Sequence, residues 1–304
     1  MAAGKGRSFT GGRFALDVAG HNVGFLKKFS GLNLAGEVAE NDTGPDNRVF
    51  KHITTIKPTE AKCTMGIGMG KGMYDWIKLS FDKSFEPRSG SFTSADFDYR
   101  AQSTCTFHDA LITSVTIPKM DGSSKEAAYF DIGFDAERVE WARAGGENIK
   151  AKFGVKQKTW LCCNFRLEID DMPCERVATV ESFTWKCSVV RDQIGTTKWS
   201  TIHPAKVTTP EIKFAISYDD HDKWAAWAKL WFVDGKCADE DEKSGRLVFL
   251  GPDMNKELGH IEFDHLGFKS FEDAESAANA ESIKRFNITL YCEQMKFVLN
   301  DIDA

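Results

Sequence analysis

The chain has 304 residues, a net charge of −6 at pH 7, and 42% hydrophobic and 12% aromatic residues. This apolar content can supply a core, which excludes an intrinsically disordered protein. No stretch holds the roughly 18 to 20 uninterrupted apolar residues of a membrane span, and residues 1–14 lack the apolar segment of a secretory signal. We therefore expect no membrane partner and no bulk export, and the length predicts two domains.

Charge and cysteine content narrow the class further. Residues 1–160 carry a net charge of +3 and residues 161–304 a net charge of −9, without a run of basic residues, which argues against tight nucleic-acid binding. The eight cysteines form no C-x-x-C pair and indicate reduced thiols in a cytosolic compartment. The neighbouring Cys162 and Cys163 are interpreted as buried thiols at the start of a strand.

Taken in chain order, the two halves repeat one pattern. Residues 14–18 and 165–169 alternate apolar and polar side chains as a half-buried strand does, at an offset of 151. A second strand pair is predicted at 29–34 and 181–186. Long connections follow at 36–51 and 191–199.

A helix is predicted next in each half, at 75–81 and 226–232, again at an offset of 151. In the second copy Trp224, Trp227, Leu230 and Trp231 fall on one helix face, because they recur at three- and four-residue spacings. We expect this face to pack on a sheet rather than to hold a ligand. Asp220 and its neighbours up to Lys223 are expected to cap the helix.

Strand periodicity returns at 106–111 and 130–134, matched by 262–267 and 286–290 at an offset of 156. Five extra residues in the charged loop at 238–244 would explain the change of offset. The Gly- and Lys-rich stretch after residue 145 is the natural linker. The sequence thus predicts domain 1 at 1–145, a linker at 146–160 and domain 2 at 161–304, in a mainly β (α+β) class with two tandem β-sandwich or barrel domains, each with one short helix.

Several of these segments resemble one known family. They are Phe14–Val18, Phe29–Leu32, Lys51–Lys57, Met73–Ile77 and above all the run Phe107–Glu126, with its apolar strand, Pro, Asp and Ser-Ser-Lys turn. Together they resemble the tail tube protein family of contractile phage tails and phage-tail-like injection systems. The resemblance covers residues 12–142. Over 163–300 it rests mainly on the internal repeat, and the usual family member has one such domain, so this chain resembles a tandem version.

The resemblance implies sixfold rings of tube domains, stacked into a hollow conduit inside a sheath. With two domains per chain, three chains would make a pseudo-hexameric ring. The implied partners are further copies of the chain, a sheath protein, and baseplate and tail-terminator proteins, with transient passage of DNA or protein cargo. Assembly is implied in the bacterial cytoplasm, into a virion tail or tail-like particle. An acidic wall would let a polyanion slide, although acidity also keeps proteins soluble.

The long connections are candidate ring-stacking loops, because their turn residues and mixed charges are typical of protruding hairpins. An ordinary solvated loop would have the same composition. The candidate stacking residues are Glu40, Asn41, Asp42, Asp46, Asn47, Arg48, Arg191, Asp192 and Lys198.

Signals for chemistry are weak, and we expect no enzyme, cofactor or metal site. His260 and His265 lie near Glu262 and Asp264, but strand geometry would place His265 on the opposite face. The segment 218–222 lacks the Gly and final Glu of an EF-hand, and the glycine-rich run 65–72 does not have P-loop spacing. Two alternatives to a tube protein remain: a trimeric baseplate hub or tube-initiating adaptor, and a monomeric β-barrel binding module.

Overall fold

The computed structural model of the chain describes residues 12–42, 49–150, 160–273 and 283–300. Among these residues β-strands predominate, which confirms the predicted mainly β class. The first half holds helix α1 (Lys71–Phe81) and the second half helix α2 (His221–Phe232). Short 3-10 helices, η2 (Tyr218–Asp220) and η3 (Asp239–Asp241), flank α2.

The strands fall into two series along the chain. Those of the first half are β1 (Arg13–Val18), β2 (His21–Asn22), β3 (Gly24–Ser30), β4 (Leu34–Asn41), β5 (Phe50–Pro58), β6 (Ala61–Met69), β7 (Arg88–Ala95), β8 (Ala101–Ile117), β9 (Met120–Asp121), β10 (Phe130–Asp135) and β11 (Arg138–Arg143). Those of the second half are β12 (Phe165–Ile169), β13 (Val177–Val180), β14 (Phe183–Asp192), β15 (Thr201–Thr208), β16 (Ile212–Ser217), β17 (Lys243–Leu250), β18 (Glu257–Asp273) and β19 (Arg285–Leu299).

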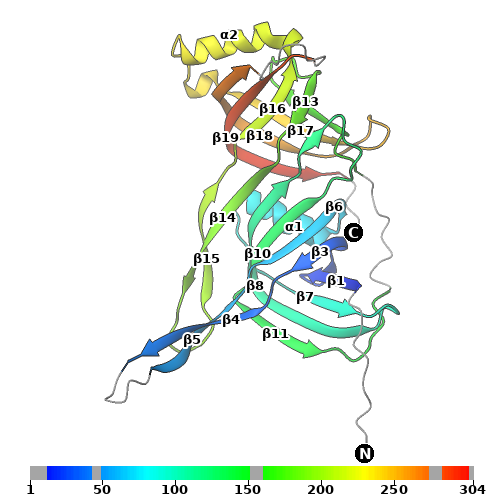
Figure 1. The fold of residues 1–304 in the computed structure, drawn as a ribbon, viewed down its shortest axis with the longest axis vertical. Coiled ribbons are helices and arrows are strands. Elements are labelled where there is room, and N and C mark those ends of the chain that lie inside the picture. The colour runs from blue at the N-terminus through cyan, green and yellow to red at the C-terminus, as the bar shows by residue number, and fades with distance from the viewer. Residues whose placement is uncertain (1–11, 43–48, 151–159, 274–282, 301–304) are drawn as a thin grey trace, which may run out of the picture.

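The two large sheets share a run of six strands in the same order (Figure 1). The first runs β2-β1-β7-β8-β10-β6-β3, and the second runs β12-β17-β18-β19-β16-β13-β9. The strands β1, β7, β8, β10, β6 and β3 correspond in this order to β12, β17, β18, β19, β16 and β13, whereas β2 and β9 have no counterpart among the described strands. The repeat seen in the sequence is also a repeat of topology.

The pairing register repeats as well. Asp131 pairs with Thr116 in the first sheet, and Asn287 pairs with Glu272 in the second, which are the same positions at an offset of 156. Both strand pairs are interrupted by a bulge at equivalent residues, Thr113 and Lys269, which are skipped in the ladders. Because a one-residue slip would turn every side chain to the opposite face, this agreement means that the two sheets present equivalent faces.

The offsets place the insertion more exactly than the sequence did. Leu16 pairs with Phe92 and Leu167 with Leu247, so the offset is already 155 in β17, and it becomes 156 in β18. Four extra residues therefore precede β17 and one lies in the β17–β18 turn, whereas the sequence predicted all five in the loop at 238–244. The predicted strand at 29–34 is also interrupted, because Gly31 and Leu32 have positive φ angles and end β3 at Ser30.

One core runs through both halves. In α1, Met73, Trp76, Ile77 and Phe81 recur every three or four residues and are buried against the sheets, as an amphipathic helix requires. In α2, Trp224, Trp227 and Trp231 are buried, and the Trp227 ring lies 4.4 Å from that of Phe268 in β18. Leu230, predicted on the same face, is exposed.

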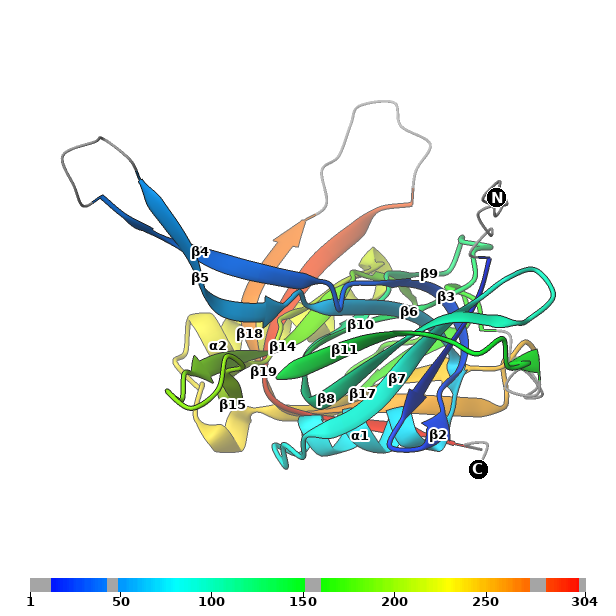
Figure 2. The ribbon, with the colours of Figure 1, turned by 90° about the horizontal axis from the view of Figure 1, so that it is seen from below.

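The two hairpins differ in what they contact. The β4–β5 pair forms a separate two-stranded sheet that extends from the molecule on the side opposite α1 (Figure 2). The β14–β15 pair instead joins the first sheet, because β14 pairs with β8. In return β9, from the first half, pairs with β13 of the second sheet. The predicted division into domains 1–145 and 161–304 stays a prediction, and most of its linker lies outside the described residues.

Candidate functional site

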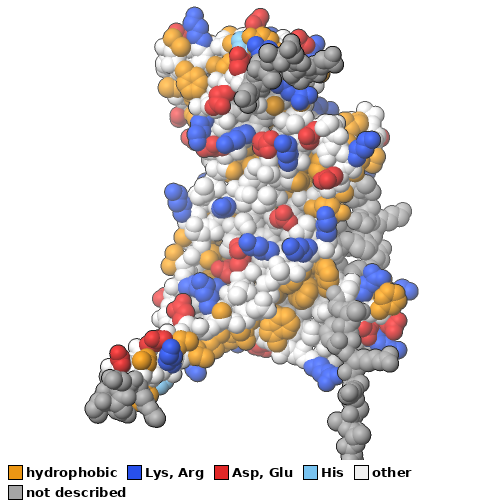
Figure 3. Space-filling view, viewed as in Figure 1, with side chains coloured by type: hydrophobic (Ala, Val, Ile, Leu, Met, Phe, Trp, Pro, Cys, Tyr) orange, Lys and Arg blue, Asp and Glu red, His pale blue; other side chains and the backbone are white. Residues whose placement is uncertain are grey.

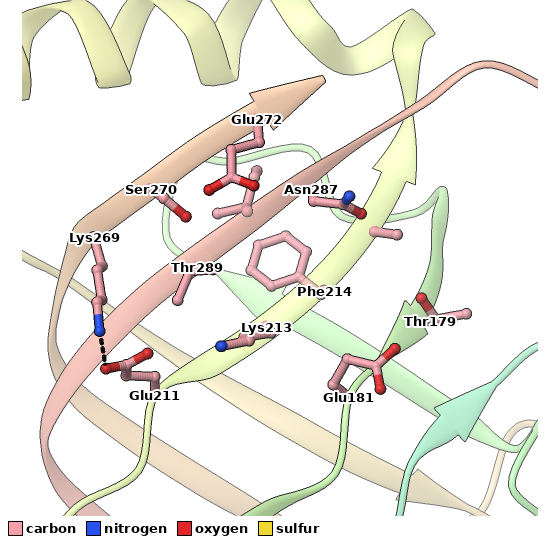
Figure 4. Close-up of a pocket in the computed structure, with 12 residues that line it drawn as sticks. Thr179, Glu181, Glu211, Lys213, Phe214, Lys269, Ser270, Glu272, Asn287 and Thr289 are labelled. Atoms are coloured by element: carbon pink, nitrogen blue, oxygen red, sulfur yellow. Dashed lines mark hydrogen bonds and ion pairs between the residues drawn. The ribbon is translucent and has the colours of Figure 1, made fainter. Parts of the chain in front are cut away.

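The outer face of the second sheet holds a polar hollow of about 500 Å³, shown in Figure 4. Alternation explains its polarity, since Phe286 and Ile288 of β19 point into the core while Asn287 and Thr289 point outward. Lys269 forms an ion pair with Glu211 at one side of the hollow. The lining residues are Thr179, Glu181, Glu211, Lys213, Phe214, Ala215, Lys269, Ser270, Glu272, Asn287, Ile288 and Thr289.

The first sheet holds a matching hollow of about 320 Å³. Its lining residues are Lys28, Ser30, Lys62, Thr64, Ser114, Thr116, Asp131, Ile132 and Gly133, and each has its counterpart in the lining of the second hollow. Lysine is kept at Lys62 and Lys213, whereas Lys28 and Ser30 correspond to Thr179 and Glu181. Figure 3 shows charged side chains of both signs scattered over this face of both sheets. The face therefore does not concentrate charge of one sign.

The two sheets are joined by β14, which lies along β8. Phe183 pairs with Ile117 and Lys186 with Ser114, and between them the hydroxyl oxygens of Thr116 and Thr184 lie 2.9 Å apart. Through these two threonines the polar face of the first half continues across the β8–β14 junction.

The core side of this junction is aromatic. Trp185 stacks on Phe81 of α1, with ring centroids 5.0 Å apart, and Phe297 of β19 lies 6.0 Å from the same ring. Such pairs contribute about 0.5–1.5 kcal/mol beyond their buried area. The second half is therefore held to the first by both a strand pair and a buried aromatic cluster.

The far end of the β14–β15 hairpin is anchored by Arg191. Its guanidinium lies 3.3 Å from the Asp135 carboxylate and donates to Ser200 Oγ at 3.2 Å. Burial raises the pKa of Asp135, and the positive charge of Arg191 opposes that rise. Beside this pair the backbone N–H of Ile202 donates to Glu137 Oε1 at 2.8 Å.

The predicted stacking residues lie in the two hairpins. Glu40 and Asn41 end β4, Asp42 follows them, and the Glu40 carboxylate accepts from Lys51 Nζ at 2.5 Å. Asp46, Asn47 and Arg48 lie outside the described residues. Arg191 and Asp192 end β14, and the carbonyl of Lys198 accepts from the N–H of Ile56 in β5 at 3.4 Å. The structure thus brings Lys198 to the base of the other hairpin, and the guanidinium of Arg191 is engaged within the chain.

The histidines of β18 have separate partners. His260 Nδ1 lies 2.6 Å from Glu257 and Nε2 3.3 Å from Glu262. His265 Nδ1 lies 2.8 Å from Glu242, and this hydrogen bond raises the pKa of His265. Ligand atoms of Glu242, His265 and Glu293 lie within 4.8 Å of one another, which is the spacing a metal site needs, but the group is largely exposed. Exposed acidic groups of this kind are common without an ion.

The buried thiols of Cys63 and Cys105 are poor nucleophiles. Burial raises the pKa of Cys63 to about 12 and that of Cys105 to about 11, so both are held as thiols. Cys163 is partly buried and Cys237 is exposed. No described helix has the length and apolarity to cross a membrane.

Sequence reasoning missed the β8–β14 junction. The sequence places apolar side chains at equivalent positions in both halves: Trp185 stands where the first half has Leu34, and Phe297 stands where it has Trp141. The pattern alone could not show that the pair in the second half is buried and the pair in the first half is exposed.

No protein-family model matches the sequence, and no curated protein matches it. Among solved structures, a chain of the sheath–tube complex of the PVC extracellular contractile injection system in its extended state is 22% identical, with a TM-score of 0.40, over 45% of this chain and 93% of that chain. The tube-terminating cap of the anti-feeding prophage is 22% identical, with a TM-score of 0.42, over 47% and 97%. A chain of the sixfold-symmetrised anti-feeding prophage baseplate is 8% identical, with a TM-score of 0.36, over 49% and 97%.

Proposed function

We propose that the chain is a structural, non-catalytic subunit of the inner tube of a contractile phage tail or related injection system, a tandem version of the tube domain. Three chains would form a pseudo-hexameric ring, and rings would stack into a hollow tube. The observation that carries this proposal is the β8–β14 junction. It sets two sheets that share a run of six strands in the same order edge to edge within one chain, as two neighbours in a ring would be.

The polar sheet face supports a conduit. It runs from one hollow to the other through Thr116 and Thr184, opposite the face that α1 and the core occupy. A wall of mixed charge and hydroxyl groups would hydrate a passing cargo without holding it. DNA or protein cargo would pass, with sheath, baseplate and tail-terminator proteins as external partners and assembly in the bacterial cytoplasm.

Electron microscopy of the concentrated chain, with native mass spectrometry of the same sample, tests the ring. We expect hollow rings of three chains that stack into tubes. A ring of six chains, or a strict monomer at high concentration, would contradict the proposal. Rings of three that never stack would favour the hub or tube-initiating adaptor instead.

A deletion tests the stacking loops separately. Removing residues 41–47 takes away the predicted protrusion between β4 and β5 while leaving both large sheets. We expect rings of unchanged mass that form shorter stacks or none. Tubes of normal length would remove these residues from ring-to-ring contact.

A further inference from the structure

Residues 268–273 of β18 are paired on one side only. There β19 pairs with them, for example Ser270 with Thr289, and no described strand pairs with their other edge. The equivalent residues of β8, 112–117, have β10 on one side and β14 on the other. Native proteins usually cover such an edge, because its free N–H and C=O groups accept any extended strand.

An exposed aromatic side chain lies beside this open edge. Phe232, at the end of α2, has its ring 5.9 Å from that of Phe268 in β18. Its counterpart in α1 is Phe81, which is 4% exposed under Trp185, whereas Phe232 is 52% exposed. The second half thus repeats the binding surface of the first half and leaves it uncovered.

In the first half, the counterparts of the side chains that cover Phe81 are exposed. Leu34 of β4 stands at the position of Trp185, and Trp141 of β11 stands at the position of Phe297. Leu34 is 55% and Trp141 47% exposed, against 2% and 1% for their counterparts. The two lie close together, because Trp141 Nε1 donates to the carbonyl of Leu32 at 3.1 Å.

From this match we propose that the start of β4 in one copy of the chain pairs with the open edge of β18 in another. The register follows from the pairs Thr184–Thr116 and Trp185–Val115 within the chain, which become Asn33–Glu272 and Leu34–Phe271 between copies. Leu34 and Trp141 of one copy then cover Phe232 of the other. This inference rests on the proposed function in one respect: the second copy is taken to be the neighbouring chain of the ring.

A hydrogen bond at the hairpin anchor also has equivalent residues in the proposed contact between copies. Glu137 accepts the N–H of Ile202 at the hairpin anchor, and the equivalent residues are Glu293 and Lys51. Glu293 is exposed at the end of the open surface. Between copies, Glu293 is therefore placed to accept the N–H of Lys51, which fixes the far part of the β4–β5 hairpin.

The two surfaces are different, so the contact is head to tail. β4 and β11 belong to the first half and β18 and α2 to the second, so each copy offers one surface of each kind. Such a heterologous contact makes a closed ring or an open filament, and it does not make a twofold dimer.

Cysteine pairs test the register. In a Cys237→Ser background, which removes the exposed native thiol, one chain carries Asn33→Cys and a second chain carries Glu272→Cys. After mixing at a concentration that permits assembly and mild oxidation, we expect a covalent dimer that contains one chain of each kind, since directly paired strand residues have Cα separations within disulfide range. Asn287→Cys in place of Glu272→Cys is the matched control, because Asn287 lies one strand farther from the edge and should not cross-link with Asn33→Cys.

The chain supplies its own positive control. A double variant Thr116→Cys, Thr184→Cys tests the intrachain pair that serves as the template, and it should form a disulfide within one chain. If that pair forms and the mixed pair does not, the proposed contact is wrong even where rings of three are seen. If either single variant cross-links with itself, the contact is twofold and the proposal is also wrong. A mixed dimer from a sample whose rings do not hold three chains would support this contact and contradict the ring instead.

A second measurement does not depend on disulfide geometry. Phe232→Ser should raise the concentration needed for half-assembly by about tenfold, because aromatic anchors buried at the centre of an interface dominate its binding energy. Phe97→Ser, at another exposed Phe in the β7–β8 turn, is the control and should leave assembly unchanged. Equal effects of the two changes would contradict the proposal.

Discussion

The β14–β15 and β4–β5 hairpins occupy equivalent places in the two halves but end in different environments. Each contains a bulge at the same point, between Cys187 and Val189 in one and between Glu37 and Val38 in the other. Yet β14 is built into the first sheet and β4 is paired only with β5 among the described strands. The contrast teaches that the hairpin geometry is set by the repeat, whereas burial is set by whether a neighbouring sheet edge is available.

The largest expected effect contrasts the two junction side chains. Trp185→Ala should lower the free energy of unfolding of the dilute chain by about 3–5 kcal/mol, because it removes a buried aromatic side chain from the Phe81 stack. Leu34→Ala should change it by no more than about 0.5 kcal/mol, because Leu34 is exposed in a single copy. Urea unfolding at low protein concentration measures both. Similar losses would mean that the two hairpins are equally buried.

Two equivalent glycines, one in each half, test whether the close approach of neighbouring strands is the same in both sheets. An added Cβ at Gly90 would meet the carbonyl of Asp17, and one at Gly245 would meet the carbonyl of Glu168, each at less than 3.0 Å. Gly90→Ala and Gly245→Ala should each cost about 1–3 kcal/mol, since neither backbone can move without opening the sheet. Gly66→Ala, where nothing lies within 4 Å, is the control for the unfolding measurement. Loss at only one of the two sites would show that the edge strands pack differently.

A smaller effect belongs to the polar side of the junction. Thr116→Val and Thr184→Val, singly and together, form a double-mutant cycle on the 2.9 Å hydroxyl pair. We expect a coupling of about 0.5–1.5 kcal/mol in thermal or urea unfolding. The same cycle on Asn33 and Glu272 should give no coupling in the dilute chain. Coupling there without assembly would mean that β4 contacts β18 within one copy.

The smallest expected effect is a pH dependence of folding stability that arises from one histidine of the second half. The hydrogen bond that His265 donates to the Glu242 carboxylate raises the pKa of His265 above the ordinary value of 6.5, so the folded chain binds this proton more tightly than the unfolded chain. The resulting stability is fully present below pH 6.5 and is lost as the pH rises through the raised pKa. His265→Gln should reduce this loss of stability. Unfolding midpoints measured at several pH values between 6 and 8 test it. An unchanged slope would show that the pair contributes nothing in solution.

The sequence was sufficient for features that depend on local periodicity. Alternation at 14–18 and 165–169 predicted β1 and β12, and the Trp spacing predicted α2 with its buried Trp224 and Trp227. The offset of 156 even matched the register of β10 with β8 and of β19 with β18, because side chains that repeat must keep their face.

Features that depend on distant partners were not accessible in the same way. Val38 and Val189 have the same alternating surroundings, so nothing local tells that β14 finds β8 while β4 does not. Arg191 looked like a free loop charge, and only the fold brings Asp135 to it. The hollows were missed for a similar reason, since their polar residues come from strands separated by up to about a hundred residues.

The covalent continuity between β8 and β14 has a consequence for how any assembly would respond to dilution. Contacts between separate chains weaken as the protein concentration falls, whereas the β8–β14 contact is held by its own chain at a fixed effective concentration. Dilution can therefore separate one chain from another, but it does not separate the two repeats within a chain. A ring of these chains would have half as many contacts that depend on concentration as a ring of the same size built from single repeats.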